Sequence, residues 1–300
     1  MGLQRFILLA LFGLIAQLID GALGMAYGLT STTLLLASGF APAVASASVH
    51  LAEVGTTLAS GAAHWKLGNT DWRAVRWLAL PGGVGAFAGA TVLSNLDGDA
   101  AKPWISVFLV VLGAYVLVRF AFLGGRIQVR EGAMRRPLLA PLGLVAGFLD
   151  AIGGGGWGPL ATPTMLASGR MEPRKVIGTV STSEFVVALC ASIGFLVSMN
   201  RSVFVLPVVA ALLVGGAIAA PLAAWLVKWL HPRVLGATVG GLIVLTNGRT
   251  VLTALGVEAN AQYLAYAVIA AVWVAAVVVA FRGARRTPLG QSALAASPAD

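Results

Sequence analysis

The sequence predicts an all-α integral membrane protein. Only 10% of its 300 residues are charged, 58% are hydrophobic, and the mean hydropathy is +0.90. Soluble domains carry roughly 25% charged residues, so this chain has too few charges to cover a water-facing surface. Its apolar runs of about 20 residues match the length of membrane-spanning helices, and they lack the alternation that is typical of a membrane barrel.

A second observation is an internal repeat with an offset of 130 residues. Residues 13–39, GLIAQLIDGALGMAYGLTSTTLLLASG, match residues 143–169, GLVAGFLDAIGGGGWGPLATPTMLASG, at eleven positions. After one inserted residue the match extends to Glu53 and Glu184. Because a segment with an internal copy belongs to the folded unit, we expect the apolar N-terminal segment to be structural and not a cleaved signal peptide.

The apolar segments divide the chain into two halves and one extra C-terminal segment. Half one contains segments 6–39, 43–63, 74–95 and 104–124; half two contains 138–169, 176–197, 204–226 and 234–255; and segment 261–281 has no counterpart. The expected organisation is a first transmembrane repeat (1–125), a basic cytoplasmic linker (126–137), a second transmembrane repeat (138–256), an extra C-terminal transmembrane helix (257–282) and a disordered tail (283–300).

The first unit of each half is expected to be a broken helical hairpin. Segments 6–39 and 138–169 are too long for one ordinary span and too short for two spans with a loop. Glycines and an aspartate interrupt each one near its centre. Open backbone at membrane depth is tolerated only where protein or a water-filled cavity surrounds it, so these tips are expected to lie inside the protein.

The basic residues predict the orientation of the segments. If each hairpin enters and leaves on one side and every other segment crosses once, sixteen of the 20 Lys and Arg fall on the side of the C-terminus. The other side keeps Arg5, Lys102, Arg201 and Arg249. The positive-inside rule then predicts that the C-terminus and the 126–137 loop are cytoplasmic. Three crossings per half also make the repeats inverted, a plan common among secondary transporters.

The positive charge and the single cysteine carry little further information. Basic loops of a membrane protein account for the net charge of +9, so no nucleic-acid partner is expected. The basic linker is interpreted as a topology signal, with a lipid-headgroup site as the alternative. Cys190 lies in an apolar run and has no partner for an intramolecular disulfide. No cofactor or metal site is expected.

Acids at membrane depth are the main functional candidates, because each is costly there. Asp20 and Asp150 lie at the hairpin tips, and Glu53 and Glu184 lie near the centres of their segments. The aspartates are interpreted either as caps of broken helices or as groups that act on substrate or protons. The glutamates are candidates for proton coupling, with a structural hydrogen bond as the alternative. His50 shares a helix face with Glu53.

Glycines, hydroxyls and aromatic residues around these acids predict a site for a small polar ligand. Glycine tips let a ligand approach backbone N–H groups, and helix N-termini attract anions. The alternatives are close helix packing for the glycines and bonds to the helix's own carbonyls for the hydroxyls. The candidate binding residues are Gly24, Tyr27, Gly28, Thr30, Ser31, Thr32, His50, Gly153, Gly154, Gly155, Gly156, Trp157, Thr162, Ser181 and Ser183.

An enzyme is not expected. The sequence contains no H-E-x-x-H and no G-x-S-x-G motif, and the four-glycine run lacks the lysine of a phosphate-binding loop.

Two stretches resemble the TauE/SafE sulfite exporter family. They are GGGGWGPLATPTMLASG with the following PRKVIGTVSTSEFVVALCASIGF, and the first-half copy that begins DGALGMAYGLTSTT. The resemblance covers roughly residues 8–255, so the ninth segment departs from it. It implies export of a small sulfur-containing anion, sulfite or an organosulfonate such as sulfoacetate, across the cytoplasmic membrane. The bilayer is the expected environment and protons are a candidate co-substrate; an anion channel and a non-transporting membrane sensor are the alternatives.

Overall fold

The computed structural model describes residues 2–23, 25–123, 136–168, 170–171, 173–199, 203–226 and 231–285. Within these residues it is all-helical, as predicted. The helices are α1 (Leu3–Leu23), α2 (Tyr27–Ala37), α3 (Pro42–Lys66), α4 (Trp72–Ser94), α5 (Gly98–Ala121), α6 (Arg136–Gly153), α7 (Trp157–Ala167), α8 (Pro173–Met199), α9 (Leu206–Leu226), α10 (Pro232–Ala254) and α11 (Ala259–Arg285). Most of the linker at 126–137 and of the tail at 283–300 lies outside the described residues.

Several helix starts follow from local chemistry. The carboxylate of Asp71 accepts the amides of Arg73 and Ala74 at the start of α4, at 2.9 and 3.2 Å. Asp97 caps α5 in the same way, and Pro42 opens α3, where its missing N–H costs no helical bond. These caps satisfy donors that a helix start otherwise leaves free.

Six described helices are long and apolar enough to cross a bilayer: α4, α5, α8, α10, α11 and the part of α1 up to Asp20. The 25-residue α3 lies outside this group. Ser46, Ser48, His50 and Glu53 lower its hydropathy, and their side chains are buried inside the protein. The apolar parts of α6 and α9, Leu138–Gly153 and Leu206–Ala219, are shorter than 18 residues.

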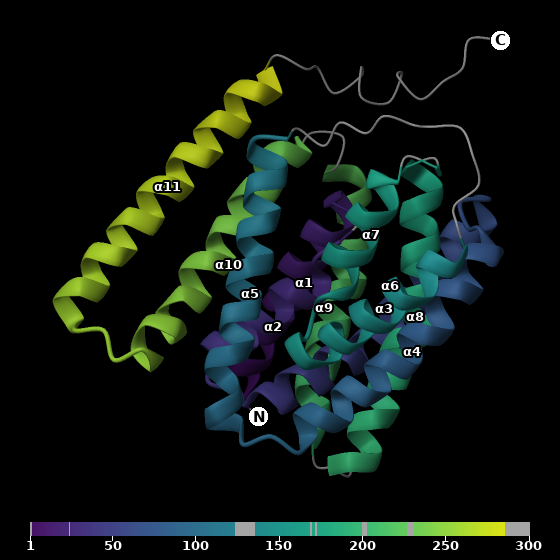
Figure 1. Cartoon of the computed structure of the whole chain (residues 1–300), viewed down its shortest axis with the longest axis horizontal. Coiled ribbons are helices and arrows are strands. Elements are labelled where there is room, and N and C mark those ends of the chain that lie inside the picture. Colours follow the sequence, from purple (N-terminus) through teal and green to yellow (C-terminus); the bar gives the residue numbers. More distant parts are fainter. Residues whose placement is uncertain are drawn as a thin grey trace.

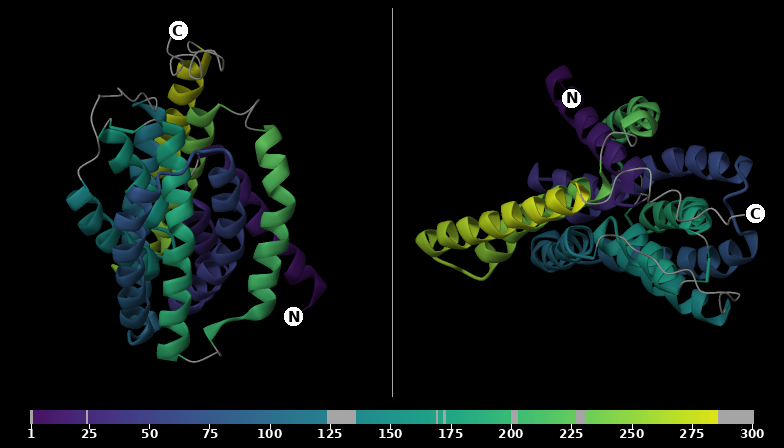
Figure 2. Two further views of the ribbon diagram at one scale, coloured as in Figure 1. Left: turned by 90° about the vertical axis from the view of Figure 1, so that its right-hand side faces the viewer. Right: turned by 90° about the horizontal axis from the view of Figure 1, so that it is seen from above.

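The two halves pack through contacts between helices of one half and helices of the other. α4 of half one packs against α6 and α8 of half two, and α1 packs against α9. Figure 1 shows the broken helices α2 and α7 within the bundle, and Figure 2 shows α1 beside α9 at one edge. α11 runs along the outside, where Ala276 and Ala280 contact α5 and α10.

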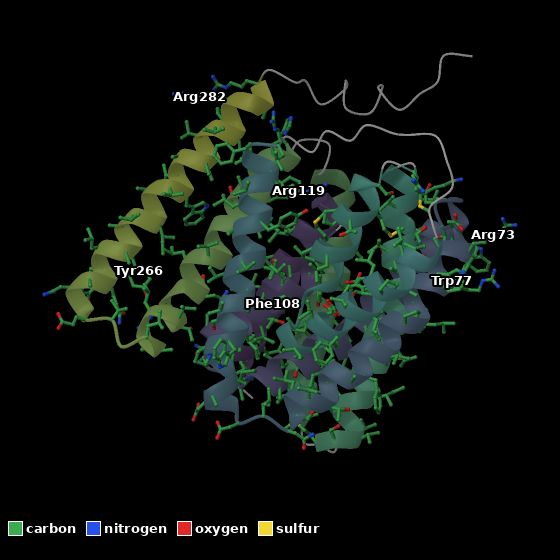
Figure 3. All side chains as sticks on the ribbon, viewed as in Figure 1. Arg73, Trp77, Phe108, Arg119, Tyr266 and Arg282 are labelled. Carbon is green, nitrogen blue, oxygen red and sulfur yellow. The ribbon has the colours of Figure 1, made fainter. Side chains whose placement is uncertain are left out.

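The short helices α2 and α7 lead toward opposite ends of α4. Leu36, near the end of α2, lines a cavity with Asp99 at the start of α5, which directly follows the end of α4. Beyond the end of α7, Met171 contacts Thr179, whose hydroxyl accepts the amide of Asp71 at the start of α4. Arg119 and Arg282 lie toward one end of the bundle (Figure 3).

Glycines allow the helices that join the two halves to touch through their backbones. A Cβ at Gly143 or Gly147 of α6 would collide with carbonyl oxygens of Leu78 or Gly82 on α4. The equivalent pair shows the same contact, because a Cβ at Gly13 of α1 would collide with a carbonyl of α9. Such small-residue contacts replace the hydrophobic driving force that is missing between helices in lipid.

We predict that Gly147→Ala lowers the stability of the protein although alanine favours helices. The clash with Gly82 should cost about 1–3 kcal/mol, which exceeds the gain of about 1 kcal/mol in helix propensity. Gly248→Ala on α10 is the matched control, because its nearest contact would be an ordinary 3.6 Å. Thermal unfolding of both variants in one detergent measures the difference. Equal unfolding temperatures would contradict the predicted packing.

Candidate functional site

The two helix breaks meet in the buried centre of the protein. Gly28, in the first turn of α2, lies against the other break: a Cβ there would be 2.8 Å from the Cα of Gly155 and 3.1 Å from the carbonyl oxygen of Gly154. The hydroxyl of Thr32 donates to that same carbonyl. Segments 130 residues apart thus form one site. Gly24, another predicted site residue, lies outside the described residues.

An aspartate caps the helix that follows each break. The Oδ1 atom of Asp20 accepts the amide of Tyr27 at 3.3 Å, and that of Asp150 accepts the amide of Trp157 at 2.9 Å. Both bonds span seven residues, so the repeat in sequence is also a repeat in hydrogen bonding. This geometry matches the capping interpretation of the two aspartates.

Asp150 has a second role that Asp20 does not share. Its Oδ2 atom lies 3.1 Å from Nε2 of His50, and both side chains are buried. Nδ1 of His50 lies 2.8 Å from the carbonyl oxygen of Ser46, whose hydroxyl donates to the carbonyl of Ala151 at 2.6 Å. These bonds fix α3 of half one to the tip of α6. The position equivalent to His50 in half two is Ser181.

The glycines of the second break form a tight turn. Gly154 and Gly155 have φ of +67° and +156°, which side chains disfavour. Their amides donate to the carbonyl of Asp150 at 2.6 and 3.2 Å. In this structure these two amides are therefore bonded within the break. Gly153 packs against the ring of Phe108, which Figure 3 places near the middle of the bundle.

The aromatic residues of the tips are also engaged. Trp157 is fully buried, and its indole Nε1 donates to the carbonyl of Val180 at 3.2 Å. The hydroxyl of Tyr27 donates to the carbonyl of Leu212 at 3.4 Å. With these bonds made, neither aromatic side chain has a free polar hydrogen in this structure.

Several buried hydroxyls on the helices around the breaks are unpartnered. Thr30 on α2, Ser48 on α3 and Thr162 on α7 are at most 2% exposed. Their side-chain oxygens have no hydrogen-bond partner among the described residues. A buried polar group without a partner costs about 1–3 kcal/mol, so these hydroxyls are suited to contact a polar ligand. Ser48 was not among the predicted site residues, although it lies only five residues before Glu53 in the sequence.

Ser31 on α2 is fully buried, and its hydroxyl also has no hydrogen-bond partner among the described residues. The two predicted serines of α8 are less available. Ser183 donates to the carbonyl of Thr179 within its own helix at 2.7 Å, and Ser181 pairs with Ser60 of α3 at 2.9 Å. Gly156, also buried, lies against the backbone of Asp150. Ser181 and Ser183 therefore join and shape helices in this structure.

Four carboxylates surround the meeting point. Glu53 is buried, and its Oε1 atom faces Gly28. It interacts electrostatically with Glu184, Asp150 and Asp20. Within the described part of the chain, no lysine or arginine forms an ion pair with these acids, and no group of three His, Cys, Asp or Glu side chains has the arrangement of a metal site. The centre is therefore acidic, with His50 as its basic partner.

A polytopic helical chain whose two interrupted helices meet around buried polar groups belongs to the class of membrane transporters. The model of the family described as "Sulfite exporter TauE/SafE" matches residues 9–250. The chain belongs to this family, as its motifs predicted. It is also 51% identical over 277 residues, 92% of either chain, to the "Probable membrane transporter protein YtnM" of Bacillus subtilis (strain 168). No solved structure matches.

We predict that Asp150→Ala destabilises the protein more than Asp20→Ala. Each substitution removes a cap of about 1 kcal/mol, but Asp150→Ala also leaves His50 buried without its partner, for a further loss of about 1–3 kcal/mol. Unfolding temperatures in detergent rank the two variants. An equal or larger effect of Asp20→Ala would show that the pair with His50 contributes nothing to stability.

Proposed function

We propose that this protein is a secondary transporter that exports small sulfur-containing anions, sulfite or organosulfonates such as sulfoacetate, across the cytoplasmic membrane by alternating access. The observation that carries the proposal is the contact between the two breaks, where Gly28 meets Gly154 and Gly155. Membership of the TauE/SafE family supports the substrate class. Transporter sites commonly lie at such meetings of broken helices near the membrane centre.

We further propose that the two halves are inverted repeats. Reciprocal packing supports this arrangement. α1 packs on α9, and its equivalent α6 packs on α4, which is the equivalent of α9. The opposite directions of α2 and α7 along α4 support it as well. On this arrangement the charge distribution predicts that the C-terminus and the linker are cytoplasmic.

The chemistry of the centre favours proton coupling. A small anion finds the unpartnered hydroxyls of Thr30, Ser48 and Thr162 and the positive ends of the helices that follow the breaks. It also meets Glu53 and Glu184, and ionised carboxylates repel an anion. Protons that neutralise these groups lower the repulsion, so binding of the anion and of protons should favour each other.

The transport activity is predicted for proteoliposomes that contain the purified protein. Radiolabelled sulfite and sulfoacetate should move faster than in protein-free vesicles, and taurine and sulfate serve as comparison solutes. A pH gradient should accelerate movement of the transported anion. If none of the four solutes moves, the transporter proposal fails and the sensor alternative is favoured. Currents far above carrier turnover, without any need for a gradient, would instead indicate a channel.

The two glutamates provide a separate prediction. Glu53→Gln and Glu184→Gln mimic the neutral acid, so the pH gradient should lose most of its effect on transport while the anion still binds. Glu258→Gln is the matched control, because Glu258 is exposed before α11, away from the centre. Initial rates with and without a pH gradient measure the effect. An unchanged gradient dependence in both central variants would contradict proton coupling through these residues.

A further inference from the structure

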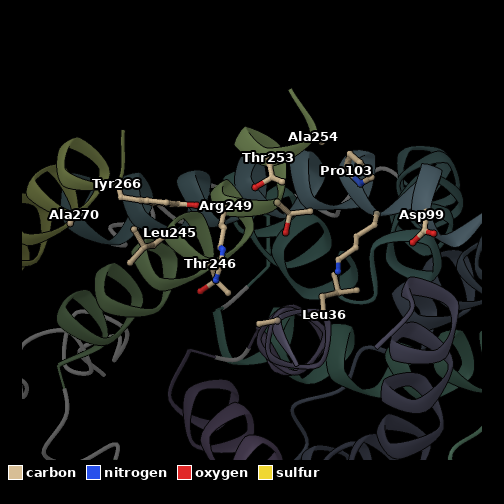
Figure 4. A pocket seen from close by; sticks show the side chains of 13 residues that line it. Leu36, Asp99, Pro103, Leu245, Thr246, Arg249, Thr253, Ala254, Tyr266 and Ala270 are labelled. Carbon is tan, nitrogen blue, oxygen red and sulfur yellow. The ribbon is translucent and has the colours of Figure 1, made fainter. Parts of the chain in front are cut away.

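A cavity that carries charged side chains lies away from the centre, at the base of the extra helix. Its volume is about 820 Å³, and it lies between the end of α2, the start of α5, the end of α10 and the start of α11. Figure 4 shows the side chain of Tyr266 extending from α11 toward Arg249 of α10. Since the family match ends at residue 250, the wall contributed by α11 lies beyond the matched region.

The charged side chains that line this cavity carry a net positive charge. Lys102 and Arg249 contribute two positive charges, against the single carboxylate of Asp99. Neither cation forms an ion pair or a hydrogen bond with another described residue. The hydroxyl of Tyr266 is buried and also lacks a partner there, and it lies close enough to Arg249 for an electrostatic interaction. Unpaired cations beside a free hydroxyl match a negatively charged oxygen ligand.

The position of the cavity relates it to the central site. α2 begins at the central break and ends at the cavity, where Leu36 and Ala37 line the wall. Its 11 residues span about 16 Å, so the two sites are separate. Asn247 of α10 donates to the hydroxyl of Thr33 on α2 at 3.1 Å, which ties the cavity wall to this helix.

We propose that this cavity binds the oxyanion group of a small sulfonate, sulfate or phosphate, with Arg249 and Lys102 supplying the charge and Tyr266 a hydroxyl donor. The charge distribution predicts that this end of the bundle lies outside the cell. A role of the cavity as a second binding site on the export path therefore rests on the proposed function. A phospholipid headgroup carries the same oxyanion chemistry, so the experiment separates the two sources.

The test uses a single cysteine as a reporter. Cys190→Ala removes the one native cysteine, and Thr253→Cys places a thiol one helical turn after Arg249, among the residues that line the cavity. Two thiosulfonate reagents are compared, one carrying a sulfonate and one carrying a trimethylammonium group. The labelling rate of the sulfonate reagent, divided by that of the trimethylammonium reagent, should fall about tenfold when Arg249→Gln and Lys102→Gln are added. Arg282→Gln, at the other end of α11, should change nothing.

Protection identifies the ligand. Methanesulfonate or sulfate, at an ionic strength matched with chloride, should slow labelling of Thr253→Cys, and Tyr266→Phe should weaken this protection. Ala261→Cys, an exposed position at the same end of the protein, corrects for surface potential. Protection by added anion in both phosphatidylcholine and phosphatidylglycerol vesicles indicates a soluble anion. Labelling that is slowed in phosphatidylglycerol vesicles without added anion indicates a headgroup.

Equal relative rates in the parent and the double Gln variant, or no protection from either source, would overturn the proposal. The labelling assay needs no transport, so this outcome is distinct from a failure of the proposed function. Anion protection without transport in proteoliposomes would retain the cavity and reject its place in an export path.

Discussion

The structure depends on one close contact between two pieces of backbone. Gly28 of one break lies against Gly154 and Gly155 of the other, at distances that leave no room for a Cβ atom. Broken helices inside a membrane need protein or a cavity around their free polar groups, and here each break provides that surrounding for the other. The bond from Thr32 to the carbonyl of Gly154 satisfies one of the groups that the second break exposes. Side chains at these glycine positions would separate the breaks and remove their mutual cover.

Around this contact the two halves make equivalent hydrogen bonds with different residues. Asp20 and Asp150 cap the helix after each break, and Tyr27 and Trp157 each donate to a carbonyl of a neighbouring helix. Among the described residues, the second break contains two glycines at positive φ, and the first contains Ala26 at φ +105°. That conformation costs a residue with a Cβ about 1 kcal/mol or more.

The repeat made much of the architecture predictable from the sequence. An offset of 130 residues located both breaks, and the cost of acids in a membrane was enough to single out Asp20, Asp150, Glu53 and Glu184. The bonding of each group was not predictable, because it depends on packing between the halves. No local pattern indicates that the indole of Trp157 donates to Val180, that the amide of Gly154 is used by Asp150, or that Tyr266 faces Arg249.

The unequal bonding of the two breaks determines what a rearrangement of the centre would cost. The second break is held to α3 and α8 at both of its ends. Asp150 and Ala151 of α6 bond to His50 and Ser46, and Trp157 of α7 bonds to Val180, with distances of 2.6–3.2 Å. The tip of α1 is closed by Asp20 at 3.3 Å, and Tyr27 reaches α9 at 3.4 Å. Longer hydrogen bonds are weaker, so these bonds hold the first break to its neighbours less tightly than the second break is held. α2 also carries the wall of the outer cavity through Thr33 and Asn247, so a displacement of this helix changes the central site and the cavity together.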